Sequence, residues 1–211
     1  MSMTTGLIAI RGRHLDKLAE IFNFFSLVDT GNDTILTNWD QVSQLIDEEY
    51  KSQDDHSQRR IVWIDNGWTI IEDFSLILCT DEPAMEAISR HLSTPVFSLV
   101  TQGTSGSYAF WYFDKQKLRS FWIDNGEVTD NFGTPLPQEV SFNFDDTASY
   151  DDIHGLAKKL GIDIENTSHL DHFVVKQLDN SEELDQEIRQ AAENYQQPGN
   201  STKSKPWWKF W

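Results

Sequence analysis

The hexapeptide from Tyr108 to Phe113 consists of five aromatic residues and one alanine, and it constrains the fold more than any other segment. Successive side chains of a β-strand point to opposite faces of the sheet. A strand that is apolar at every position must therefore be covered on both faces, and it must lie inside the sheet rather than at an edge. This segment predicts a central, fully packed strand.

Short apolar runs bounded by turn residues surround this segment. Val96–Val100 and Leu118–Ile123 flank it, and the connections at 103–106 and 114–117 are rich in Gly, Ser, Asp and Lys. Runs of β-branched and aromatic residues between such turns predict antiparallel strands. Further strands are expected at Thr5–Ile10, two or three times within residues 60–80, and at Phe173–Val175.

Four segments carry apolar residues at helical spacing. The expected helices cover Arg13–Phe25, Asp81–Leu92, Ser149–Leu160 and Ser181–Asn194. Ser149 and Asp152 have the form of a capping box, and Gly161 should end that helix. The whole pattern predicts an α+β fold, with an antiparallel sheet of short strands and about four flanking helices.

The expected organisation is one globular domain over residues 1–194, a linker at 195–202 and a separate peptide at 203–211. A chain of 211 residues can bury a core without disulfides or a metal. The linker is rich in Gln, Pro, Gly, Asn and Ser. Residues 29–58 are mostly polar, with room for one helical turn at 45–50, and they predict a long, mobile connection.

The pentapeptide WIDNG occurs twice, at residues 63–67 and 122–126. Each copy ends an apolar run on Asn-Gly, the dipeptide that favours tight hairpin turns. The flanking residues do not match, and repeat arrays generally need three or more units. Convergent turn chemistry is therefore our interpretation, with a true internal repeat as the alternative.

Cysteine usage and hydropathy bear on the compartment. The single cysteine, Cys79, lies in the apolar run 74–79, which is typical of a buried structural thiol. One cysteine cannot form an internal disulfide, which agrees with a reducing compartment. Residues 1–13 lack a signal-peptide core, and no run reaches the ~18 apolar residues that a membrane span needs. We expect a cytoplasmic protein.

The charge is strongly acidic and unevenly spread. The chain has 17 basic and 34 acidic residues, and the last eleven residues hold three lysines and no acid, so residues 1–200 carry a net −20. Such a body repels nucleic acid, whose binding depends on Lys and Arg contacts to phosphates. The acidity either serves solubility alone or attracts a basic protein partner.

The search for catalytic and metal-binding motifs is largely negative. His169 and His172 could share a helix face, but the pair lacks the Glu of H-E-x-x-H and a third clustered ligand. The run Gly103–Ser107 misses the final Gly of G-x-S-x-G and is interpreted as a hairpin turn. His14, His91 and His154 are expected on helix surfaces or at caps. No catalytic residue, metal or cofactor is predicted.

A resemblance adds a weak functional expectation. The segments Gly6–Gly12, Gly67–Ile70, Gly106–Phe110 and Asn131–Pro137 together resemble those of uncharacterised bacterial proteins, some of them immunity-type proteins that neutralise toxins. The resemblance covers about residues 5–165. Its motifs are structural, so it implies no active site and favours a bacterial binding protein.

Two functional hypotheses follow. The first is a non-catalytic bacterial protein that binds a basic protein partner, in one form as an immunity protein against a basic toxin. The expected acidic contacts are Asp47, Glu48, Glu49, Asp54, Asp55, Asp145, Asp146, Asp151 and Asp152. The alternative is an enzyme with an unrecognised site near the Gly103–Ser107 turn, joined by Asp124–Glu127 and by His154 or His169. The oligomeric state stays open.

The C-terminal peptide is the most unusual segment, because four of its last five residues are aromatic and its only charges are lysines. Its rings either complete the domain core or dock on a partner. The preceding linker favours docking, and the acidic body disfavours anionic membranes. The expected docking residues are Lys205, Trp207, Trp208, Lys209, Phe210 and Trp211.

Overall fold

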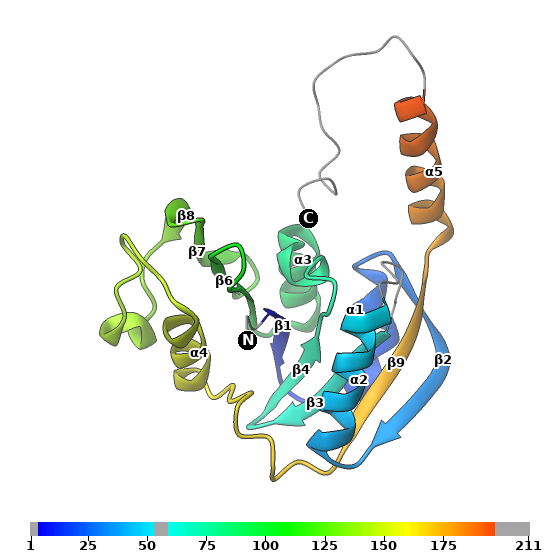
Figure 1. Cartoon of the computed structure of the whole chain (residues 1–211), viewed down its shortest axis with the longest axis horizontal. Helices are drawn as coiled ribbons and strands as arrows, with labels where there is room; N and C mark the ends of the chain where they lie inside the picture. The colour runs from blue at the N-terminus through cyan, green and yellow to red at the C-terminus, as the bar shows by residue number, and fades with distance from the viewer. Residues whose placement is uncertain (1–3, 53–58, 197–211) are drawn as a thin grey trace.

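The computed structural model describes residues 4–52 and 59–196, and these form one antiparallel sheet with helices on both faces (Figure 1). The strands are β1 Thr4–Arg11, β2 Leu27–Leu36, β3 Arg59–Asp65, β4 Trp68–Glu72, β5 Val96–Gln102, β6 Ser107–Phe113, β7 Lys117–Asp124, β8 Glu127–Gly133 and β9 Phe173–Asn180. The α-helices are α1 Leu18–Asn23, α2 Trp39–Ser52, α3 Glu82–Leu92, α4 Tyr150–Lys159 and α5 Glu182–Gln196. Short 3-10 turns lie at Leu15–Lys17, Leu78–Thr80 and Pro137–Ser141. The predicted α+β class is confirmed.

The nine strands follow the order β2-β9-β3-β4-β1-β5-β6-β7-β8. Every neighbouring pair is antiparallel. β9, close to the end of the described chain, lies between β2 and β3. This part of the sheet therefore forms only when segments far apart in the sequence pair. The sheet is larger than the short strands of the sequence indicated.

Each face of the sheet carries its own apolar cluster. One cluster joins one face of β1 and β5 to α1 and α3, through residues such as Ile8, Phe22 and Met85. The other joins the opposite side of the same strands to α2 and α4, through residues such as Val42 and Leu156. We call this second side the α2/α4 face. In Figure 1, α4 lies over the β6–β8 end and α2 over the β2, β9 and β3 end.

β6 confirms the prediction made from its all-apolar sequence. It lies between β5 and β7, with Phe110 opposite Leu99 and Phe121. Phe110 packs in the α2/α4 cluster, whereas Trp111 packs in the cluster on the other face. Both faces of the strand are therefore covered.

The two WIDNG copies form tight turns at opposite ends of the sheet. Asn66 and Gly67 have φ values of 47° and 76°, and Asn125 and Gly126 have 49° and 82°. Positive φ at both central residues is the requirement of a type I′ hairpin turn, which Asn-Gly meets at low cost. The first turn joins β3 to β4, near the Arg11 end of β1, and the second joins β7 to β8 at the other end.

One local prediction was wrong, and one strand was not predicted. Residues 29–58 are not a long connection, because β2 runs to Leu36 and α2 spans Trp39–Ser52. β2 is an edge strand with a mostly exposed surface and an irregularity between Asp29 and Asp33, so its polar residues do not show the alternation of a half-buried strand. β3 and β4 are the two strands predicted within residues 60–80, the apolar run after them contains a 3-10 turn at Leu78–Thr80, and β8 was not foreseen.

The predicted ends of α3 and α4 are confirmed, whereas the helix expected at Arg13–Phe25 is a 3-10 turn followed by the shorter α1 at Leu18–Asn23. The Ser149 hydroxyl accepts a hydrogen bond from the Asp152 backbone N–H at 3.3 Å, and the Ser149 N–H donates to the Asp152 carboxylate at 2.9 Å. This capping box starts α4, which ends at Lys159, just before the predicted stop at Gly161. Cys79 is fully buried, and burial raises the pKa of its thiol, as expected for a structural cysteine.

Candidate functional site: an acidic face with two pockets

The described acidic contacts belong to elements on the α2/α4 face, one group on α2 and the other before and within α4, over opposite ends of the sheet. Asp47 and Glu48 are exposed on α2, whose apolar side packs in the cluster of this face. Asp145 and Asp146 are exposed in the turn before α4, and Asp151 is exposed in its first turn. Asp152 is half-buried because it completes the capping box. The side chain of Glu49, and residues Asp54 and Asp55, lie outside the described residues.

Basic side chains near α4 are occupied locally. Lys158 pairs with Asp163 at 3.0 Å. Lys159 donates a hydrogen bond to the Ser141 hydroxyl, and its ammonium lies 4.7 Å from the centre of the Phe142 ring. Asp145, Asp146 and Asp151 have no ion-pair partner among the described residues. These three carboxylates leave the α4 region with an uncompensated negative charge.

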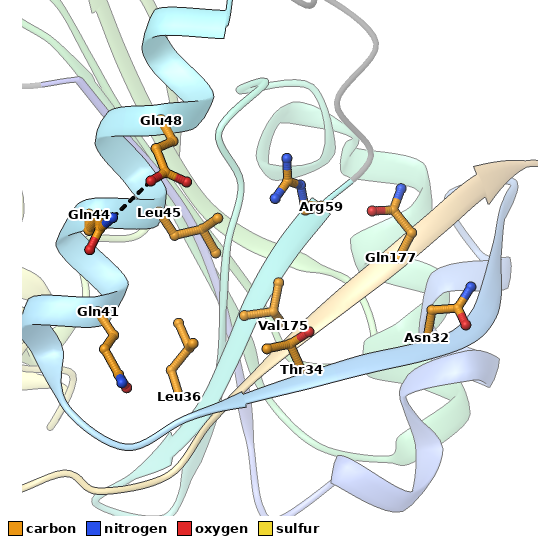
Figure 2. A pocket seen from close by; sticks show the side chains of 10 residues that line it. All are labelled: Asn32, Thr34, Leu36, Gln41, Gln44, Leu45, Glu48, Arg59, Val175 and Gln177. Atoms are coloured by element: carbon orange, nitrogen blue, oxygen red, sulfur yellow. Dashed lines mark hydrogen bonds between the residues drawn. The ribbon is translucent and has the colours of Figure 1, made fainter.

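The larger cavity lies between α2 and the β2, β9 and β3 strands, with a volume of about 460 Å³ (Figure 2). Glu48 and Gln44 extend into it from α2, where the Gln44 amide donates to the Glu48 carboxylate at 2.9 Å. Arg59 and Gln177 line the sheet side, and apolar side chains such as Val175 form the floor. The cavity offers donors and acceptors over an apolar base, which suits polar groups of a peptide or protein surface.

Sequence reasoning missed this cavity because it assigned residues 29–58 to a connection. The signal was present at Trp39, Val42, Leu45 and Ile46, which stand at helical spacing between polar residues. Trp39 packs against Trp63 and Phe173, with ring centroids 6.1 and 5.8 Å apart, and so fixes the start of α2 on the sheet.

A smaller pocket of about 230 Å³ lies between α4 and the segment 162–165. We call it the α4 pocket. Asp151, Asp163 and Glu165 contribute carboxylates to its lining, and Ile162 and Ile164 contribute apolar surface. The segment 162–165 is held close to the sheet because Ile162 is buried and the Trp68 indole donates to the Leu160 carbonyl at 3.1 Å.

His154 lines the α4 pocket, and the prediction that it is a surface or capping residue was wrong. Its exposed fraction is only 6%. Tyr150, one helical turn earlier, stacks on the imidazole with ring centroids 3.8 Å apart. Burial lowers the pKa of His154 to about 4, although the charge of Asp151 acts in the opposite direction. The imidazole is therefore neutral at pH 7.

Two further side chains, Glu72 and Tyr150, have shifted pKa values. Glu72 is 8% exposed, and burial together with the charge of Asp73 raises its pKa to about 8. Burial and the nearby carboxylates of Glu165, Asp151 and Glu72 raise the pKa of Tyr150 to about 12. No sequence pattern indicated a buried Glu72, because this residue continues an apolar run whose burial depends on the neighbouring strands.

The residues of the enzyme hypothesis are only partly brought together. The Ser107 hydroxyl donates to the Asp124 carboxylate, and Ser105 and Ser107 hydroxyls lie 2.7 Å apart. His154 approaches Thr101, in the strand that leads into this turn, at 3.5 Å. His169 instead pairs with Asp65 at 3.0 Å, at the opposite end of the sheet. Neither of the two pockets is lined by residues 103–107.

Two other sequence predictions concern the surface. His169 and His172 are exposed and lie on a loop, not on a helix, and no group of three metal-ligating side chains occurs within residues 4–52 and 59–196. The predicted linker began at residue 195, but α5 continues to Gln196; the rest of the linker and the docking peptide at 203–211 fall outside the described residues. Within the part of the chain that is described, none of the helices has the length and apolar character to span a bilayer.

Comparison of the chain with models of protein families, with curated proteins and with solved structures finds no match.

Proposed function

We propose that this chain is a non-catalytic, cytoplasmic protein that binds a basic protein partner through its α2/α4 face. The observation that carries the proposal is the gathering of separate acidic segments, residues 47–48 and 145–152, on one side of the sheet. A basic bacterial toxin neutralised by this protein is the form of partner that the sequence resemblance favours.

Two properties of the α2/α4 face support the proposal, its negative charge and its two pockets. Asp145, Asp146 and Asp151 project a negative field that no basic side chain in the described residues neutralises by an ion pair. Such a field accelerates the encounter with a cationic surface and disfavours acidic competitors. Charge at the rim sets the association rate, whereas affinity depends on a few side chains buried in pockets. The two pockets on this face supply places for such anchors.

The peptide at 203–211 is proposed as a second contact. Its aromatic residues and lysines suit a groove on a protein, since indole rings combine a large apolar surface with one polar N–H. The composition of the preceding residues, rich in Gln, Pro, Gly, Asn and Ser, favours a peptide that binds independently of the acidic face and raises the overall affinity.

A pull-down with charge variants tests the proposal. The tagged full chain is incubated with an extract of the cells that produce it, at low and at moderate salt. The face variant Asp145→Asn, Asp146→Asn, Asp151→Asn removes three charges from the α2/α4 face. The matched control Asp16→Asn, Glu183→Gln, Glu187→Gln removes three exposed charges from other elements.

The expected result is a basic protein that the wild type and the control retain at low salt, that moderate salt weakens and that the face variant loses. The same partners recovered equally by all three proteins would contradict the proposal.

A further inference from the structure

The α4 pocket has a charge pattern that its own surroundings do not satisfy. Asp151, Asp163 and Glu165 line it, and Lys158 pairs with Asp163 at 3.0 Å. Asp151 and Glu165 have no ion-pair partner among the described residues. Both residues line the pocket, and their charges also raise the pKa of the neighbouring Tyr150. The pocket therefore holds two carboxylates ready for a cation.

A second observation comes from the wall of the pocket. His154 lines it and is 94% buried, yet its Nδ1 has no hydrogen-bond partner among the described residues. The other ring nitrogen, Nε2, lies 3.5 Å from the Thr101 hydroxyl. In the tautomer whose Nε2–H donates to Thr101, Nδ1 is a buried acceptor. An unsatisfied buried acceptor is costly, and a ligand donor that reached Nδ1 from the pocket would remove that cost.

The volume and the lining of the pocket indicate that the cation it binds is a side chain. A volume of about 230 Å³ holds one long side chain but not a folded peptide. Ile162, Ile164 and Gly155 supply apolar surface for an aliphatic stem. No group of three ligating residues for a metal ion occurs in the described chain. An organic cation with several donors is thus a better fit than a bare ion.

Arginine matches this arrangement better than lysine. Its planar guanidinium presents five N–H donors, pairs with two carboxylates at once and is weakly hydrated, so it enters half-buried pockets at lower cost. We infer that the α4 pocket is a socket for one arginine side chain of the partner, held by Asp151, Glu165 and the imidazole of His154. This inference rests on the proposed function, and it names the chemical group that the acidic face recognises.

The test uses a small probe, so that it does not depend on finding the partner. N-acetyl-arginine methylamide is titrated into the isotopically labelled full chain at pH 7 and low salt, and NMR shifts are followed. N-acetyl-citrulline methylamide is the matched probe, with nearly the same shape and no charge. Saturable shifts are expected at the amides of Gly155 and residues 162–165 and at the ring of His154, with arginine only.

Variants locate the binding. Asp151→Asn with Glu165→Gln should weaken arginine binding about fivefold or more, since two charge-assisted contacts are lost. Asp145→Asn with Asp146→Asn, equal in charge but outside the pocket lining, should change it by less than about twofold. The amide spectrum of each variant reports whether the fold is intact.

Equal shifts with both probes, no saturable shift, or arginine shifts that persist in the Asp151/Glu165 variant would overturn the socket. If the socket fails while the pull-down still yields a basic partner lost by the face variant, the proposed function stands without it. If arginine binds the pocket but no basic partner depends on the face, the proposed function fails alone.

Discussion

The guanidinium of Arg119 and the carboxylate of Glu139 form a two-pronged ion pair beneath the surface, with Nε–Oε1 and Nη2–Oε2 distances of 3.0 Å each. Arg119 is 2% exposed and Glu139 4% exposed. Arg119 also donates to the Asn131 amide oxygen at 2.6 Å and to the Phe132 carbonyl at 2.9 Å. One arginine therefore ties β7 to β8 and to the 3-10 turn at 137–141.

Removing the arginine should be far more costly than removing an exposed one. Arg119→Met leaves the Glu139 charge buried without its partner, and we expect a loss of about 3–5 kcal/mol in the free energy of unfolding. The control Arg189→Met breaks an exposed pair with Asp185 and should cost under about 0.5 kcal/mol. Urea denaturation measures both. Similar losses in the two variants would show that the buried pair does not hold this end of the sheet.

Glu72 and His154 should give the protein an unusual pH dependence. The lowered pKa of His154, about 4 against 6.5 in the unfolded chain, makes stability rise with pH between these values. The raised pKa of Glu72, about 8 against 4.5, makes stability fall with pH between 4.5 and 8. From pH 4.5 to 6.5 the two contributions oppose each other.

Glu72→Gln removes the falling contribution. Relative to the wild type, the variant should gain stability by about 1 kcal/mol per pH unit as the pH rises from 4.5 to 8. The control Glu187→Gln, exposed on α5, should show no such trend. Urea midpoints at pH 5, 6.5 and 8 provide the measurement. A constant difference between Glu72→Gln and wild type across this range would contradict the buried, protonated state of Glu72.

A substitution at Gly133 tests how closely β8 approaches β7. Its φ is +84°, and a Cβ there would lie 2.0 Å from the Leu118 carbonyl oxygen of β7. Gly126, with φ +82°, has nothing within 4 Å of the same position. Gly126→Ala should cost only the backbone strain of about 1–2 kcal/mol. Gly133→Ala should cost clearly more and speed amide hydrogen exchange in β8. Equal losses in both variants would mean that β8 does not approach β7 as described.

The sequence predicted best where local patterns decide the structure. β6 and its neighbours, the tight turns at the two Asn-Gly dipeptides and the capping box at Ser149 each depend on residues close in the chain. β2 and β9 pair over a long sequence separation, Leu27 with Asn180, so their polar and short apolar runs could not show that they share a ladder. His154 became buried because Tyr150 stacks on it and Thr101 of β5 lies against it, which helical spacing alone does not reveal.

The acidic contacts were partly predictable for the same reason. Charge composition identified Asp145, Asp146 and Asp151, and their exposure follows from turn and helix-start positions. The sheet topology decides that α2 and α4 cover the same face. Local sequence patterns did not show this, because the side chains of each strand alternate between the two faces and the chain passes through the whole sheet between the two helices.

Deleting residues 203–211 tests the docking peptide. The composition of the preceding linker predicts that the truncated chain keeps its melting temperature within about 2 °C, while capture of the partner is lost. Thermal unfolding and the pull-down are measured on the same preparation. A large fall in melting temperature would mean that the aromatic residues belong to the core.

The most direct test of the acidic face is the association rate constant with the partner that the pull-down identifies, measured against ionic strength. Steering by the α2/α4 face predicts a rate constant that falls steeply as salt rises. The variant Asp145→Asn, Asp146→Asn, Asp151→Asn should lower it about tenfold at low salt, with little change in the dissociation rate constant. The control Asp16→Asn, Glu183→Gln, Glu187→Gln should match the wild type. An association rate constant that is independent of salt and equal in all three proteins would contradict binding through this face.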